Sequence, residues 1–265
     1  MIHDHLLSAR DGAVLVLTLN QPARLNAMST DMIGAINAAI DGAAADAGVR
    51  SVLITGAGRG FCAGADLSSL RQRNTGADGH VDVGISMDAL FNPMIRKIRA
   101  LEKPVIAAVN GMAAGGGANL ALACDIVLAG RSARFTQVFA RIGLIPDLGG
   151  TWSLPHNTSA MQAQALALTT DTISAEEAEK RGLVWQVCDD DKLVDEALAM
   201  ARRLAEGPTM ALGHIKRALN EASTSSLAAQ LDRERDLQRA LGRSSDFAEG
   251  VAAFLQKRKP HYTGH

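Results

Sequence analysis

The stretch from Lys103 to Trp152 most constrains the fold, because it joins a buried strand, a glycine turn and a helix start. It begins with KPVIAAVNG, a run of small and β-branched residues that predicts a buried strand. The chain then enters GMAAGGGANLALACDI, where three glycines precede a predicted helix from Ala118 to Cys124. A helix start leaves backbone N–H groups without partners, and its dipole favours negative charge. The stretch therefore predicts a place that can hold an oxyanion.

A loop with a single carboxylate follows this turn. After a second predicted strand, Asp125 to Ala129, the segment IGLIPDLGGTW carries Asp147 between apolar neighbours and a glycine pair. A carboxylate beside an oxyanion site can take and return a proton. An Asp at this place can also simply cap the turn before Leu148. The residues alone leave both roles open.

The chain before this stretch predicts two more strands and a second glycine-rich loop. Strands are expected over 13–20 and 51–55, and the second of them runs into GAGRGFCAGADL. Ser29 or Thr30 should cap a helix, and a helix over 85–101 returns the chain to the central strand. The polar segment 72–84 has no periodicity and is expected to form a flap at the site. The buried face of the first helix should carry Met32, Ile33, Ile36 and Ile40.

The chain after Trp152 is predominantly helical. Helices are expected over 161–168, 174–182 and 192–206, with one short strand over 184–187. From Thr209 onwards there is no strand signal, so this part should pack on the core or on another subunit. Trp152 and Trp185 are expected in the core, and Cys62 should be a small buried packing residue.

Composition excludes several classes of protein. With 265 residues, of which 47% are hydrophobic and 21% charged, we expect one main core. The net charge of −1 argues against nucleic-acid and membrane-surface binding. Three widely spaced cysteines and seven scattered histidines match neither a disulfide framework nor a metal site. No signal peptide or membrane span is recognisable, so a cytoplasmic protein is expected.

Three motifs together resemble the crotonase (enoyl-CoA hydratase/isomerase) superfamily over nearly the whole chain. They are FCAGADL at 61–67, AAVNGMAAGGGANLALACDI at 107–126 and IGLIPDLGGTW at 142–152. The tail LDRERDLQRALGRSSDFAEGVAAFLQKRKPHYTGH is similar to that of the ring-epoxide isomerases within the superfamily, which act on a phenylacetyl-CoA derivative. The resemblance implies an α/β fold, a crotonase-like spiral of ββα units. Residues 1–200 would form the core with the acyl-CoA site, and 201–265 a helical region that makes a homotrimer or a dimer of trimers.

The resemblance also implies the site residues. The backbone N–H groups of Ala65 and Gly116 would hold the thioester oxygen, and Asp147 would be the acid. Phe254 and Lys257 would reach the CoA from a neighbouring subunit. No cofactor is implied beyond the CoA of the substrate, and no metal. The remaining positions implied to contact the CoA or acyl group are Arg24, Ala63, Asp66, Leu67, Asn119 and Phe139.

Two positions depart from the hydratase pattern. Where hydratases of the superfamily carry two glutamates, this chain has Asn119 and Phe139, neither of which can transfer a proton. Asn119 could bind the ligand or the neighbouring loop. The expected activity is an acyl-CoA isomerase, converting a phenylacetyl-CoA ring epoxide to the oxepin or a 3-enoyl-CoA to a 2-enoyl-CoA. An enoyl-CoA hydratase of fatty-acid β-oxidation and a non-catalytic acyl-CoA-binding homologue stay open as alternatives.

Overall fold

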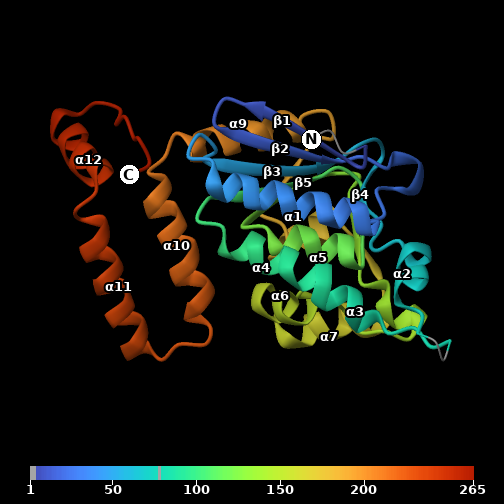
Figure 1. The fold of residues 1–265 in the computed structure, drawn as a ribbon. Helices are drawn as coiled ribbons and strands as arrows, with labels where there is room; N and C mark the ends of the chain where they lie inside the picture. Colours follow the sequence, from blue (N-terminus) through green and yellow to red (C-terminus); the bar gives the residue numbers. More distant parts are fainter. Residues whose placement is uncertain (1–3, 77–78) are drawn as a thin grey trace.

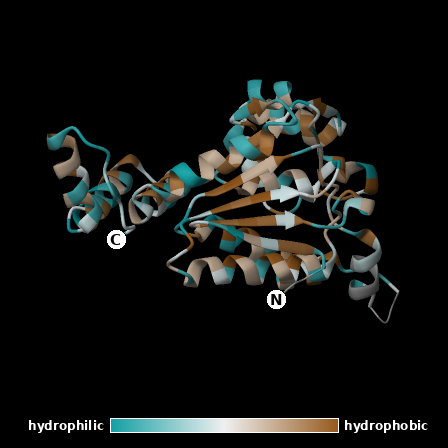
Figure 2. Cartoon of the chain, turned by 90° about the horizontal axis from the view of Figure 1, so that it is seen from above, coloured by the Kyte–Doolittle hydropathy of each residue, from teal (hydrophilic) through white to brown (hydrophobic). Residues whose placement is uncertain are grey.

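Six strands form the central sheet of the computed structural model, which describes residues 4–76 and 79–265 apart from the side chains of 70–73. The strand order is β1–β2–β3–β5–β7–β10 (Figure 1). The hairpin of β1 and β2 is antiparallel, and the other neighbours are parallel. The mostly hydrophobic colour of the strands in Figure 2 fits a sheet covered on both faces. The bounds are β1 (Leu6–Asp11), β2 (Val14–Leu19), β3 (Ser51–Gly56), β5 (Val105–Val109), β7 (Ile126–Gly130) and β10 (Gln186–Cys188).

A second sheet of four short strands adjoins the first. Its order is β4–β6–β8–β9, and only the last pair is antiparallel. Each long strand from β3 to β7 is followed by a short strand and then a helix, which confirms the spiral of ββα units. Sequence reasoning missed these strands, because three residues are too few to show a period. They are β4 (Gly60–Cys62), β6 (Met112–Ala114), β8 (Arg134–Thr136) and β9 (Thr172–Ser174).

Helices cover the central sheet. The expected cap of α1 (Thr30–Ala45) is Ser29, whose hydroxyl accepts a hydrogen bond from Met32 N over 3.2 Å. The four apolar residues predicted for its inner face are all buried. On the other face, α9 (Leu193–Ala205) packs through Ala197 and Ala201. The other helices of the body are η1 (Pro22–Arg24), α2 (Leu67–Asn74), α3 (Val83–Ser86), η2 (Met87–Phe91), α4 (Asn92–Ala100), α5 (Gly116–Ala123), η3 (Val138–Ile142), α6 (Gly150–Asn157), α7 (Ala160–Thr169) and α8 (Ala175–Lys180).

Some sequence predictions need correction. The helix expected over 85–101 is three consecutive segments, α3, a π-helical η2 and α4. The segment 72–84 is partly ordered into α2, α3 and a bridge between Thr75 and Val81, while its residues 77 and 78 lie outside the described part of the chain. The expectation that both tryptophans are core residues is wrong, since Trp152 is 40% exposed and Trp185 71%.

The C-terminal region is strand-free, as predicted, and projects from the body (Figure 1). It consists of α10 (Thr209–Ala222), α11 (Leu227–Leu241) and α12 (Ser245–Gln256). A buried ion pair joins it to the body, because Lys216 Nζ on α10 lies 2.8 Å from Asp125 Oδ2 before β7. None of the helices in the described ranges is long and apolar enough to cross a membrane.

Candidate active site

The loop after β4 leaves the Ala65 N–H group without an acceptor. Met28 pairs with this loop, since Met28 N donates to Gly64 O over 2.7 Å and Asp66 N donates to Met28 O over 2.9 Å. Between these two bonds, Ala65 N finds no acceptor among the described residues. Ala65 lines the cavity, so this donor is available to a ligand bound there.

A second free donor lies at the start of α5. Gly115 has a φ of +52°, and its N–H donates to Thr136 O over 2.8 Å. The helix begins at the next residue, and Gly116 N has no acceptor in the part of the chain that is described. A Cβ on Gly64 would lie 3.6 Å from Gly116 N, so the loop that carries Ala65 adjoins this helix start. Two backbone donors on one cavity wall form a site for a developing oxyanion.

The carboxyl group of Asp147 lies beside these donors. A Cβ on Gly116 would lie 3.5 Å from Asp147 Oδ1. This oxygen is buried and has no hydrogen-bond partner among the described residues. Burial raises the pKa of Asp147 from its usual 3.8 to about 7. A carboxyl group that titrates near neutrality can both take and return a proton.

Asn119 and Gln137 hold the backbone of Asp147. Asn119 Nδ2 and Gly150 N each donate to Asp147 O over 2.8 Å, and Gln137 Nε2 donates to Asn119 Oδ1 over 2.9 Å. Asn119 is fully buried and does not line the cavity, so its observed contact is with the loop rather than with a ligand position. Sequence reasoning missed Gln137, whose only signal is a polar residue directly after a short strand.

The cavity around these groups has a volume of about 530 Å³. Its lining is mainly apolar, which suits a ligand with an apolar part and one oxygen to be bound. The guanidinium of Arg141, another residue that sequence reasoning missed, donates to Thr170 Oγ1 over 2.8 Å. Besides Ala65, the apolar lining residues are Ala63, Leu67, Val81, Val83, Met87, Phe91, Val138, Phe139, Ile142, Leu144 and Ile145.

The other predicted contact residues do not line this cavity. Arg24 forms an ion pair with Asp66 at a distance of 2.8 Å near the surface. The Ser68 hydroxyl, more than Arg24, lowers the pKa of Asp66. Phe254 and Lys257 are exposed at the C-terminal end of α12. Figure 1 shows α12 and α2 on opposite sides of the molecule. Within one chain they do not reach the cavity.

Cys62 is buried at the end of β4, directly before the loop that carries Ala65. It is fully covered, which confirms the packing role expected for it, and burial raises its thiol pKa to about 12. A thiol so difficult to ionise is a poor nucleophile. No three His, Cys, Asp or Glu side chains within the described ranges are grouped so as to hold a metal ion.

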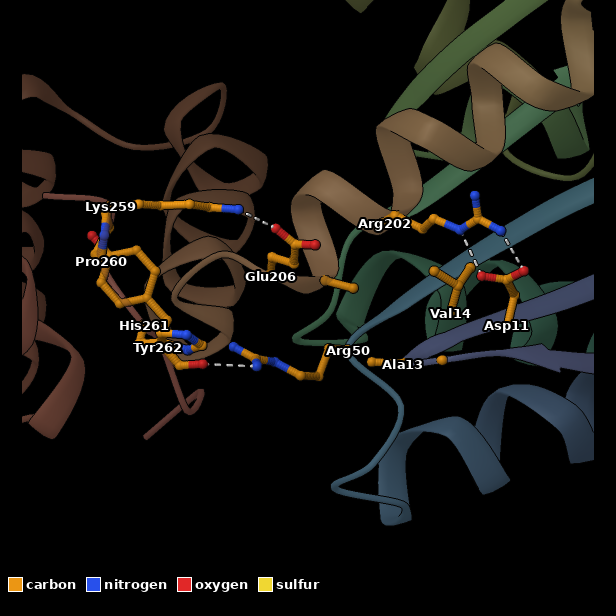
Figure 3. A pocket seen from close by; sticks show the side chains of 12 residues that line it. Asp11, Ala13, Val14, Arg50, Arg202, Glu206, Lys259, Pro260, His261 and Tyr262 are labelled. Atoms are coloured by element: carbon orange, nitrogen blue, oxygen red, sulfur yellow. Dashed lines mark hydrogen bonds and ion pairs between the residues drawn. The ribbon is translucent and has the colours of Figure 1, made fainter.

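A cleft of about 580 Å³ lies between the body and the C-terminal tail (Figure 3). Its charged side chains already have partners. Arg202 pairs with Asp11 at 2.6 Å, Lys259 pairs with Glu206 at 2.8 Å, and Arg50 donates to Tyr262 O over 3.0 Å. The Lys259–Glu206 and Arg50–Tyr262 contacts connect the C-terminal tail to the body across this cleft.

Comparisons with known proteins agree on one family. Residues 9–265 match the model described as Enoyl-CoA hydratase/isomerase. A "1,2-epoxyphenylacetyl-CoA isomerase" of Escherichia coli K12 is 49% identical over 98% of this chain and 99% of that protein. A "Probable enoyl-CoA hydratase" of Rhodobacter capsulatus is 43% identical over 94% of each. The crystal structure of an enoyl-CoA hydratase from Polaromonas sp. JS666 superposes with a TM-score of 0.89 at 38% identity, covering 97% of this chain and 99% of that one.

Proposed function

This chain belongs to the enoyl-CoA hydratase/isomerase family of acyl-CoA isomerases and hydratases, and we propose that it is an isomerase in which Asp147 moves a proton. The observation that carries the proposal is the Asp147 carboxyl group beside the oxyanion donors, with a pKa of about 7 and a buried Oδ1 that has no partner among the described residues. A group that must first be a base and then an acid works best with such a pKa. No second proton-transfer residue is needed for an isomerisation.

The steps follow from this arrangement. The thioester oxygen accepts hydrogen bonds from Ala65 N and Gly116 N. Ionised Asp147 takes a proton from the carbon next to the thioester carbonyl, and the electron pair moves onto the oxygen as an enolate. Preorganised donors that meet this charge are usually the largest source of catalysis. Asp147 then returns the proton to a carbon farther along the acyl group, so a 3-enoyl-CoA becomes a 2-enoyl-CoA.

The same proton transfer suits a ring epoxide. Asp147 would take the proton from the carbon next to the carbonyl and return it to a ring carbon. The carbon–carbon bond shared by the six-membered ring and the epoxide opens, which gives the seven-membered oxepin ring. The E. coli relative with 49% identity is named a 1,2-epoxyphenylacetyl-CoA isomerase. This name supports 2-(1,2-epoxy-1,2-dihydrophenyl)acetyl-CoA as the substrate and a role in phenylacetate breakdown. The apolar cavity fits a phenyl-derived ring.

Hydration is the second candidate, because several similar proteins are named as hydratases. A hydratase must activate water as well as deliver a proton. Asn119 is fully buried and bonded to the Asp147 loop, and the apolar Phe139 lines the cavity. These contacts favour isomerisation over hydration.

One set of assays separates the candidates. Purified protein is incubated with crotonyl-CoA, a 3-enoyl-CoA and enzymatically made epoxyphenylacetyl-CoA, and products are measured by chromatography. We expect isomerisation to be far faster than hydration. Fast hydration of crotonyl-CoA that survives Asp147→Asn would contradict the proposal.

We also propose that the C-terminal region makes a homotrimer or a dimer of trimers in the cytoplasm. Large apolar side chains are exposed on α11 and α12, including Leu227, Leu231, Phe247 and Phe254. Exposed apolar surface of this kind marks an interface. In such an assembly, Phe254 and Lys257 of one subunit could meet the CoA bound to another, with Arg24 near the phosphates.

A further inference from the structure

Leu148 lies close to the wall of the active-site cavity and also lines a second cavity. It directly follows Asp147, is 1% exposed and has a left-handed backbone with a φ of +47°. A Cβ on Gly116 would lie 2.9 Å from Leu148 Cδ1. The side chain of Leu148 therefore packs against the wall that carries the oxyanion donor.

The second cavity is small and has a mostly apolar surface. Its volume is about 280 Å³, and its lining includes Leu148 itself, Ile95 and Leu122. Trp152 also lines it, and the Arg99 guanidinium lies 5.0 Å from the centre of the Trp152 ring. Arg96, Ser153 and Asn220 are also among its lining residues, but the surface they leave exposed in it is small. The mostly apolar surface can hold an alkyl chain.

We propose that Leu148 is a specificity-determining residue that closes the acyl end of the active site and restricts the enzyme to compact acyl groups. The inference rests on the proposed function, in which the acyl group lies between Gly116 and Asp147. The Leu148 side chain touches the wall of one cavity and lines the other. Removing that side chain would join the two cavities and admit longer alkyl chains.

Binding of saturated acyl-CoAs tests the inference without any catalytic step. Calorimetry gives the Kd of butanoyl- to dodecanoyl-CoA for wild type, Leu148→Ala and Leu148→Gly. In wild type, the gain in affinity with chain length should stop within this series. In the variants it should continue, at roughly fourfold for each methylene that enters the second cavity. Leu148→Gly also relaxes the left-handed backbone, so it should fold even where Leu148→Ala does not.

Leu122→Ala is the matched control, because it removes another buried leucine from the lining of the second cavity and leaves Leu148 in place. It should leave the chain-length profile as in wild type. Adding Ala123→Leu to Leu148→Ala should refill the second cavity and abolish the gain.

Two results would overturn the inference. One is a wild-type affinity that already rises steadily up to dodecanoyl-CoA. The other is a folded Leu148 variant whose profile matches wild type. Either can occur while wild type isomerises a 3-enoyl-CoA, in which case the proposed function stands. If wild type isomerises no substrate but the variants gain long-chain affinity, the role of Leu148 is supported and the proposed function fails.

Discussion

Replacing Asp147 with Asn should abolish most of the activity and, at alkaline pH, make the protein more stable. Asn keeps the size of the side chain but cannot take a proton, so the isomerisation rate should fall roughly 10²–10⁴-fold. Acyl-CoA affinity should change little, because backbone N–H groups hold the thioester. The gain in stability follows from the environment of the carboxyl group, whose Oδ1 is buried and has no partner in the part of the chain that the structure describes.

The size of this gain can be worked from the pKa. A carboxyl group whose pKa rises from 3.8 to about 7 on folding costs at most roughly 4 kcal/mol when it ionises, at 1.36 kcal/mol for each pKa unit. Asp147 is only half-buried, so solvent lowers the cost to about 2–4 kcal/mol. An Asn amide without a partner costs about 1 kcal/mol in turn. The net stabilisation at pH 8 should be about 1–3 kcal/mol.

The pH dependence has a definite sign. Because the folded-state pKa is raised, the native protein binds more protons than the unfolded chain between about pH 4 and pH 7. The contribution of Asp147 to the free energy of unfolding of wild type is therefore highest below pH 4 and falls as the pH rises through 7. The advantage of Asp147→Asn should be largest at pH 8 and disappear near pH 5. Activity of the wild type should show the opposite trend, with kcat/KM rising through about pH 7 as the base ionises.

Thermal melts at pH 5 and pH 8, at equal protein concentration, measure the stability, and single-turnover assays measure the rate. Asp171→Asn is a suitable control, since it removes an exposed carboxylate of the same charge. If Asp147→Asn is less stable than wild type at pH 8, the carboxylate is not buried and unpaired as described. If it is stable but fully active, Asp147 is not the proton carrier.

Three further predictions concern other parts of the molecule. Gly116→Val should fold but lose about 10²–10³ in kcat, because its side chain would enter the cavity with its Cβ 3.5 Å from Asp147 Oδ1 and compete with the thioester for space. A variant that is folded by circular dichroism and active in the assay would contradict the assignment of Gly116 as a donor. Lys216→Met should lower the unfolding free energy by about 3–5 kcal/mol in urea titrations, since it leaves Asp125 as a buried, unpaired carboxylate. Adding Asp125→Asn should restore part of the loss, and no recovery would argue against the pair. Sedimentation should show trimers or hexamers at micromolar concentration, and a stable monomer would be evidence against the assembly.

Local sequence was sufficient for the parts of the site that are made of backbone. The glycines at the start of α5 and the small residues around Ala65 could be recognised in the sequence, because free N–H groups arise at turns and helix starts. The apolar period of α1 and the cap at Ser29 were predictable for the same reason, since neighbours in sequence decide them. The motifs in which these residues stand were also enough to suggest the family.

Tertiary structure alone decided how the groups meet and what surrounds them. From the sequence, Asp147 could have been a turn cap. Burial in the folded structure raises its pKa to about 7, and its Oδ1 has no hydrogen-bond partner among the described residues. Asn119 is held between Gln137 and the Asp147 carbonyl, so a Glu introduced there to restore a hydratase pair would have to displace the loop. A sequence motif specifies which hydrogen-bonding groups are present along the chain. Whether water or another side chain satisfies them depends on residues far away in sequence, because desolvation is set by the whole packed environment.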